Sequence, residues 1–177
     1  MTDEAPEDDS GADAPFDGDD LAGVVDLFGA LTQAELERAL DELAFKRGDD
    51  LDADAVAAAV DDALASYALV RYETDGADAD PDANALLAPG PAAFPTLPPN
   101  AEDLPHILEV PTREVDRAAA AEAVAERLRR DASRAVDDGD AARMRRLLDV
   151  TYDVAVWSDA VAVDDVRERL DDALDDA

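Results

Sequence analysis

Apolar residues recur at helical spacing through the first part of the chain. Between residues 20 and 31 they lie three, four and seven positions apart, at Leu21, Val24, Val25 and Phe28. This spacing forms one face of a helix, and Asp19 or Asp20 is placed to cap its first amides. The pattern therefore predicts a first helix that ends near Gly29.

Two further helices follow at once. Thr32 and Glu35 match the S/T-x-x-E capping box, and Gly48 is a natural stop for the helix that they begin. Its apolar stripe runs through Leu36, Ala39, Leu40 and Leu43. A third stripe predicts a helix over about residues 54–66, with Val56, Ala59, Val60, Ala63 and Tyr67 on its buried side.

The pattern then changes from helical to extended. Residues 68–73, rich in branched and aromatic side chains, predict a β-strand. A loop rich in Asp follows over residues 74–83, and residues 84–88 can form the returning strand. Seven of the ten prolines lie in residues 89–111, where they exclude a long regular element. Because this segment is also apolar, we expect it to pack across a surface as an extended strap.

The last third of the chain is helical again. Thr112 can cap a long helix over residues 113–137, and Asp140 can cap the next one. A final helix is predicted from about residue 164 to residue 174. We therefore predict a mainly α protein with a small β-hairpin. Its expected parts are a disordered acidic tail (1–18), a winged-helix-like unit (19–88), a Pro-rich packed strap (89–112) and a C-terminal helical unit (113–177).

Acidic residues dominate the composition. The chain holds 46 Asp and Glu against 15 Lys and Arg, which gives a formal net charge of −31. Such charge opposes folding at low salt, but at molar salt the screening length falls to about 3 Å and most of the repulsion disappears. We interpret the acidity first as adaptation to a salty cytoplasm, with solvent cations condensed on the surface. An acidic effector or nucleic-acid mimic is the alternative.

Two resemblances follow from these residues. The order helix, helix, helix, strand, loop, strand over residues 20–88 resembles a winged helix, which implies a helix-turn-helix followed by a wing. The phrases at residues 26–32, 43–45 and 89–98 resemble an uncharacterised protein family of halophilic archaea. That resemblance covers most of residues 20–174 and implies no activity.

The charges of the winged-helix-like unit disfavour DNA binding. Residues 54–66, which would form the recognition helix, contain no Arg, Lys, Asn or Gln, the side chains that read bases and hold phosphates. The only basic window is residues 127–146, whose seven Arg against four Asp give a net charge of +3. These arginines could dock an acidic partner, a nucleic acid or the N-terminal tail, or form a salt-bridged surface: Arg127, Arg129, Arg130, Arg134, Arg143, Arg145 and Arg146.

Other chemistry has little support in the sequence. The chain has no Cys, a single His (His106) and no catalytic or nucleotide-binding motif, so we expect no enzyme, no cofactor and no metal site. The N-terminus lacks the features of a signal peptide, so we expect a cytoplasmic protein without a membrane span. Phe45 lies opposite the stripe of its helix and is a candidate contact residue.

These observations favour a non-catalytic protein-interaction or regulatory module. The partner expected is another protein or a second copy of the chain. The alternative is a DNA- or RNA-binding transcriptional regulator that uses the arginines of residues 127–146.

Overall fold

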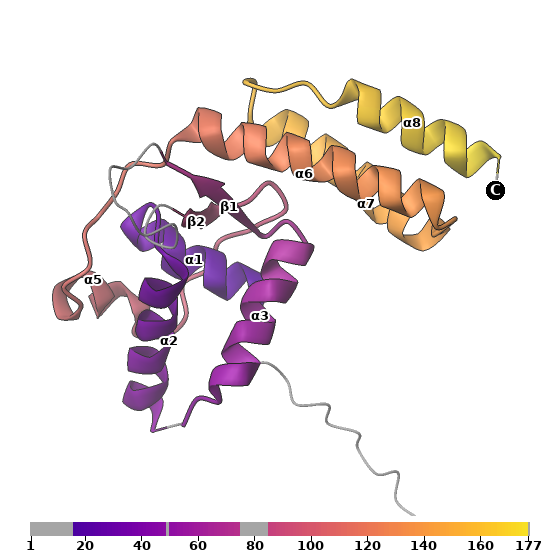
Figure 1. The fold of residues 1–177 in the computed structure, drawn as a ribbon. Coiled ribbons are helices and arrows are strands. Elements are labelled where there is room, and N and C mark those ends of the chain that lie inside the picture. The colour runs from indigo at the N-terminus through magenta and orange to yellow at the C-terminus, as the bar shows by residue number, and fades with distance from the viewer. Residues whose placement is uncertain (1–15, 49, 75–84, 177) are drawn as a thin grey trace, which may run out of the picture.

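A computed structural model describes residues 16–48, 50–74 and 85–176. The elements follow the order α1 (Gly18–Phe28), α2 (Gln33–Arg47), α3 (Ala53–Ala65), β1 (Leu69–Glu73), β2 (Ala85–Pro89), η1 (Ala101–Asp103), α5 (Leu104–Ile107), α6 (Arg117–Asp137), α7 (Ala141–Trp157) and α8 (Asp164–Asp175). The fold is mainly α with one small hairpin, as predicted (Figure 1). Most of the expected tail and of the loop after β1 lies outside the described residues. None of the helices in the described ranges is long and apolar enough to cross a membrane.

The N-terminal helices begin and end through specific caps. The capping box of α2 is formed as predicted, because Glu35 N–H donates to Thr32 Oγ1 at 3.2 Å and Thr32 N–H donates to Glu35 Oε2 at 2.8 Å. The cap predicted for α1 is wrong, since Asp17 rather than Asp19 or Asp20 accepts the first amides. Phe16, just before it, is only 3% exposed, so the folded part of the chain already includes residues 16–18.

The long helix α6 starts later than the sequence pattern indicates. Thr112 does not cap it; Asp116 does, through the amides of Ala118 and Ala119. The reason is that Arg113 is held outside the helix, with its backbone N–H donating to the carbonyl oxygen of Phe28 at 2.8 Å. Tertiary contacts thus decide where this helix begins.

The hairpin is the centre of the fold. Strands β1 and β2 pair antiparallel, with Val70 opposite Ala88 and Tyr72 opposite Leu86. Because side chains alternate across a sheet, the strands supply two faces. An isolated bridge between Leu31 and Leu87 adds a short third extended segment at the edge of β2.

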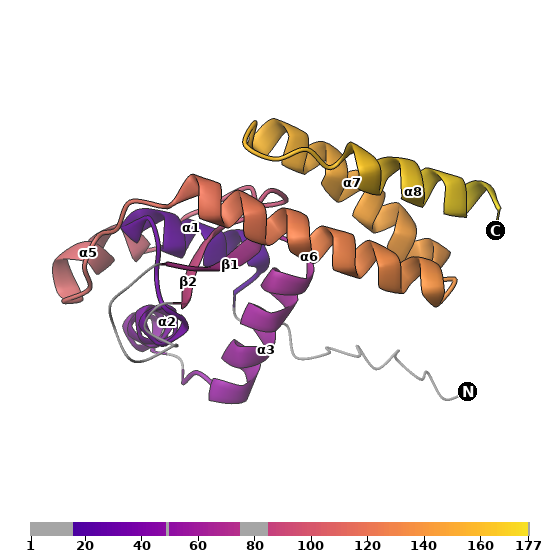
Figure 2. The same ribbon diagram turned by 45° about the horizontal axis from the view of Figure 1, so that its top comes forward.

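Each face of the hairpin belongs to a different buried cluster. Leu69 and Leu87 pack with the apolar stripes of α1, α2 and α3. On the other face, Val70, Tyr72, Leu86 and Ala88 belong to a second buried cluster with residues of α6, α7 and α8, in which α6 is the helix that contacts β1. Figure 2 shows α6 passing over the hairpin, with α7 and α8 alongside it. The hairpin therefore joins the N-terminal helices to a C-terminal helical layer.

The Pro-rich segment lies against α1. Thr96 N–H donates to the carbonyl oxygen of Asp19 at 3.1 Å, and Phe94 N–H donates to the Asp19 carboxylate at 2.8 Å. A Cβ atom on Gly23 would lie 1.7 Å from the carbonyl oxygen of Thr96, so only glycine allows this approach. Two short helical turns, η1 and α5, interrupt the segment.

Candidate functional site

The seven arginines of residues 127–146 lie on two adjacent helices. Four are on the C-terminal half of α6 and three are in the first turns of α7, and the two helices pack against each other. A tight turn through Gly139, which has φ +66°, connects them. The arginines therefore flank one end of the α6–α7 hairpin.

Two of these arginines meet a nearly buried carboxylate. Asp131 of α6 is 6% exposed, and its Oδ2 atom lies 3.5 Å from both Arg127 Nε and Arg143 Nη2. The hydroxyl of Tyr67 donates to the same oxygen at 2.9 Å. Arg127 also stacks over the Tyr67 ring, 4.8 Å from its centroid. We name these four residues the Asp131 junction.

The junction connects the N-terminal helices to the C-terminal layer. Tyr67 lies between α3 and β1 with φ +65°, a left-handed conformation that is unusual for a bulky residue. Its side chain is 2% exposed, and its carbonyl oxygen accepts a hydrogen bond from Ala92. Burial raises the pKa of the Tyr67 hydroxyl, and the negative charge of Asp131 raises it further. Tyr67 therefore remains a protonated donor to Asp131.

The remaining arginines divide into bound and unpaired side chains. Arg129 binds α8, because its Nε donates to Asp165 at 3.0 Å and its Nη2 donates to the carbonyl oxygen of Ala162 at 2.9 Å. The hydrogen bond from Arg129 lowers the pKa of Asp165. Arg145 donates from Nη1 to the carbonyl oxygen of Ala141, in its own helix, at 3.5 Å. Four exposed arginines of this window make no ion pair with any described residue: Arg130, Arg134, Arg145 and Arg146.

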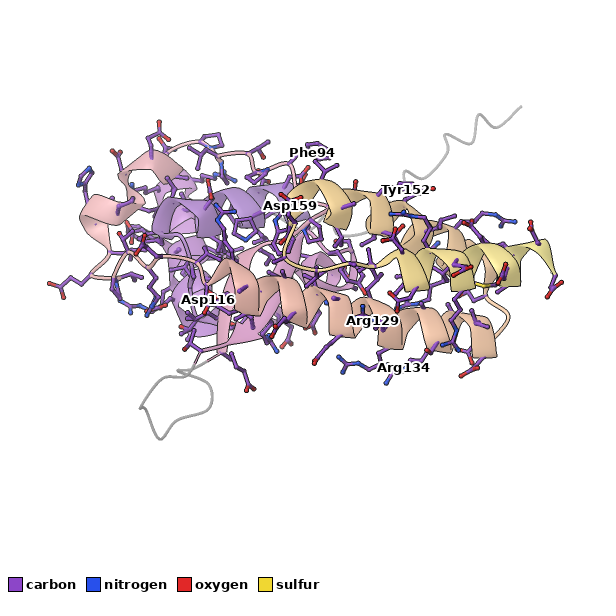
Figure 3. The ribbon with its side chains drawn as sticks, turned by 90° about the horizontal axis from the view of Figure 1, so that it is seen from above. Phe94, Asp116, Arg129, Arg134, Tyr152 and Asp159 are labelled. Carbon is purple, nitrogen blue, oxygen red and sulfur yellow. The ribbon has the colours of Figure 1, made fainter. Side chains whose placement is uncertain are left out.

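Figure 3 places two of these side chains on α6. Arg129 lies on the side of α6 that faces α8, whereas Arg134 lies farther along the helix at its outer edge. The basic window is therefore divided among internal contacts and solvent, and does not form one continuous face.

Phe45 lies in a different part of the molecule. It is in the last turn of α2 and is 79% exposed. It borders an open cavity of about 570 Å³ together with Arg38, Leu51 and Leu108, and none of the seven arginines lines that cavity. The structure therefore separates Phe45 from the other predicted contact residues.

Two cavities lie on either side of Tyr67. One, of about 420 Å³, separates the end of α3 from α7, and is here named the α3–α7 cavity. The other, also about 420 Å³, lies between α3, β1 and α6 and includes Arg71, Arg127 and Arg130. Tyr67 lines both cavities, so its position links them.

The i,i+4 spacing in the sequence pairs Arg127 with Asp131, but sequence reasoning missed the contacts of Asp131 with Arg143 and with Tyr67. The available signal was Asp131, which lies three residues after Leu128 and four before Ala135, on the apolar stripe of α6. A carboxylate at such a position needs a buried donor. Nothing in the local pattern identified Tyr67 as that donor, because it is 64 residues away.

The described side chains offer little for metal chemistry. Among them, no three His, Asp or Glu residues are grouped so as to hold a metal ion. His106, in the short helix α5, is exposed. The chemistry available at the Asp131 junction is that of paired charges and hydrogen bonds.

Comparisons with known proteins identify a family without an assigned activity. A search of the curated proteins and a search of the solved structures each found no significant match. A family model described as "Family of unknown function (DUF7109)" matches residues 19–175, which is most of the chain. The protein therefore belongs to the family of unknown function DUF7109.

Proposed function

We propose that this protein is a non-catalytic protein-interaction or regulatory module, that it works in a salt-adapted cytoplasm, and that its N-terminal unit is winged-helix-like. The order α1, the Leu31 bridge, α2, α3, β1 and β2 supports the winged-helix likeness. A winged-helix-like fold does not by itself determine function, so the kind of partner has to be inferred from the exposed side chains.

The charge on the exposed face of α3 gives the main support for a protein partner rather than a nucleic acid. This helix corresponds to the one that would enter the major groove, yet its exposed charged side chains are all acidic: Asp54, Asp61 and Asp62. Carboxylates repel phosphates, and the attraction between cations and phosphates provides most non-specific affinity for nucleic acid. An acidic and alanine-rich α3 therefore favours a protein surface as its partner.

The arginines of α6 and α7 do not reverse this conclusion. Asp131 and Asp165 pair with three of the seven, which leaves four exposed arginines without an ion pair to a described residue. Strong salt-dependent binding to duplex DNA involves about 6–10 phosphate contacts, and it weakens steeply as salt rises. Four unpaired arginines in molar salt supply too little attraction for such binding.

We propose a non-catalytic function because the chain contains few of the side chains that commonly act as nucleophiles or general bases. The chain contains no Cys, and its single His lies exposed in α5. The usual nucleophile and general-base combinations therefore have few members here.

Capture of a partner protein in molar KCl, the salt condition of the proposed salt-adapted cytoplasm, tests this function. The full chain, carrying an affinity tag, is incubated in molar KCl with an extract of the source cells, with and without nuclease. We expect one or a few proteins to be enriched in both samples. Recovery that disappears after nuclease treatment, or a defined enzymatic turnover by the purified chain, would contradict the proposal.

A matched variant locates the surface. Replacing Asp61 by Arg reverses a charge on the exposed face of α3, at a residue that does not line the α3–α7 cavity and without changing a buried residue. We expect this variant to fold and to lose the captured protein. The same replacement at Asp171, which is exposed on α8, is the control and should retain it. Equal capture by both variants would exclude α3 from the contact.

A further inference from the structure

The α3–α7 cavity combines an apolar lining with charged side chains at its border. The apolar part comes from Ala65 at the end of α3 and from Leu147 and Val150 of α7, with Tyr67 beside them. Arg143 and Arg146 of α7 and two carboxylates, Asp62 and Asp149, supply the charges. Its volume of about 420 Å³ accommodates one or two side chains of another molecule.

The two arginines lack full compensation. Arg143 and Arg146 are three residues apart, so they lie on the same side of α7. Arg143 is 3.5 Å from Asp131, but it shares that single carboxylate oxygen with Arg127 and with Tyr67. Arg146 forms no ion pair with any described residue, including the nearby Asp62 and Asp149. Of the two guanidinium groups that border the cavity, only that of Arg143 therefore has an ion-pair partner among the described residues, and it shares this partner with Arg127.

We propose that the α3–α7 cavity binds an acidic side chain of a partner protein, with the apolar side chain next to it seated against Leu147 and Val150. This inference rests on the proposed function and specifies the chemistry of the partner. The carboxylate completes the pairing of Arg143 and Arg146, since a guanidinium group offers parallel donors that match a carboxylate. The adjacent apolar group covers the exposed Ala65 and contacts the outer edges of Leu147 and Val150, which are already largely buried.

The charges around the cavity select a single carboxylate over a chain of phosphates. Asp62 and Asp149 border the same cavity, so a polyanion that extends beyond the arginines meets repulsion from these carboxylates. A lone carboxylate flanked by neutral residues avoids them. The chain's net charge of −31 does not prevent such contact in molar salt, where repulsion is screened beyond about 3 Å.

Binding would also reach the Asp131 junction. A carboxylate that pairs with Arg143 competes with Asp131 for the same guanidinium group. Asp131 then depends more strongly on Arg127 and on the Tyr67 hydroxyl, which joins the N-terminal helices to α6. A ligand in the cavity therefore changes the strength of the hydrogen bond between Tyr67 and Asp131.

Small amphipathic probes test the inference directly. The native chain is titrated in molar KCl with 3-phenylpropionate, and separately with 3-phenylpropionamide, while its backbone and methyl NMR signals are recorded. We expect saturable shifts at Ala65, Leu147 and Val150 with the carboxylate. The neutral amide should bind at least about fivefold more weakly, because it lacks the charge-assisted hydrogen bonds.

Two arginine variants supply the specificity control. Arg146→Gln should weaken binding of 3-phenylpropionate at least about fivefold. Arg134→Gln, which removes an equally unpaired arginine that does not line the cavity, should leave it unchanged. Equal binding of the acid and the amide, no shifts at the cavity, or equal effects of the two variants would each overturn the proposal.

Two further outcomes identify other errors. Tighter saturation by inorganic phosphate than by 3-phenylpropionate would overturn the inference in favour of a phosphate-bearing ligand. If Arg146→Gln still captures the same protein as the native chain, the cavity is not the contact although the proposed function stands. If the native chain captures no protein, the proposed function itself fails, whatever the probes show.

Discussion

Replacing Tyr by Phe at two buried positions, Tyr67 and Tyr72, should change the free energy of unfolding in opposite directions. The Tyr67 hydroxyl donates to Asp131 at 2.9 Å, inside the contact between the N-terminal helices and α6. The Tyr72 side chain is equally buried, and its hydroxyl lies near the backbone of Asp116 but forms no hydrogen bond of ordinary geometry with any described residue. Both replacements keep the ring, so they isolate the value of each hydroxyl.

The expected size of each effect follows from these contacts. A hydrogen bond to a charged group contributes about 1.5–3 kcal/mol to the free energy of unfolding. In Tyr67→Phe, Asp131 keeps Arg127 and Arg143 at 3.5 Å, so its charge is not stranded. We therefore expect the lower end of that range, a loss of about 1.5 kcal/mol. Tyr72→Phe removes an unsatisfied buried hydroxyl and should be neutral or stabilising by up to about 1 kcal/mol.

Urea unfolding in molar KCl measures both changes. Far-UV circular dichroism and the fluorescence of Trp157 give two probes of the same transition, and their agreement checks two-state behaviour. For a chain of this size, a loss of about 1.5 kcal/mol corresponds to a melting temperature lower by about 3–6 °C. Equal losses in the two variants, or a larger loss in Tyr72→Phe, would refute the role assigned to the Asp131 junction.

Three other predictions concern glycine, pH and salt. Gly29 and Gly48 both have φ +78°, but a Cβ would lie 1.9 Å from the Arg113 carbonyl oxygen at Gly29 and would meet nothing within 4 Å at Gly48. Gly48→Ala should therefore cost about 1 kcal/mol and Gly29→Ala at least about 3 kcal/mol in urea unfolding; equal costs would contradict the close approach. Burial raises the pKa of Glu35, but hydrogen bonds from Arg113 and Thr32 and the charge of Arg113 together outweigh it and lower the pKa below its ordinary value. The pairing therefore stabilises the fold above the ordinary pKa, and this stabilisation is lost as pH falls through the lowered one. The difference in unfolding free energy between the native chain and Glu35→Gln should thus be about 1–2 kcal/mol at neutral pH and shrink in acid, whereas a difference independent of pH would exclude this pairing. Dilution of KCl from molar to about 0.1 M should lower the melting temperature, because the charge of −31 is no longer screened, and an unchanged melting curve would contradict salt adaptation.

Local sequence patterns predicted most elements because the signals that set them are themselves local. The capping box at Thr32 and Glu35, the stop at Gly48 and the cap at Asp140 each involve residues within one or two turns. The strands also lie within a residue of their predicted positions. These features depend on periodicity and on hydrogen bonds to neighbouring amides.

The sequence-based predictions fail where contacts between residues far apart in the chain determine the structure. Thr112 has the chemistry of a helix cap, but Arg113 is tied to Phe28 and Glu35, more than 75 residues earlier, so α6 starts only at Arg117. The same limit applies to the candidate site. The sequence revealed a basic window in residues 127–146, yet it could not show that Asp131 occupies two of its arginines, or that Tyr67 joins them.

Binding to nucleic acid tests the central claim most directly, namely that the arginines of α6 and α7 serve internal and protein contacts. The measurement is a fluorescence anisotropy titration of labelled duplex DNA and single-stranded RNA, with the native chain and with Arg130→Glu, from molar KCl down to about 0.1 M. We predict no saturable binding of either nucleic acid in molar KCl and no difference between the two proteins. Saturable binding by the native chain that weakens steeply with salt and is lost in Arg130→Glu would contradict the account.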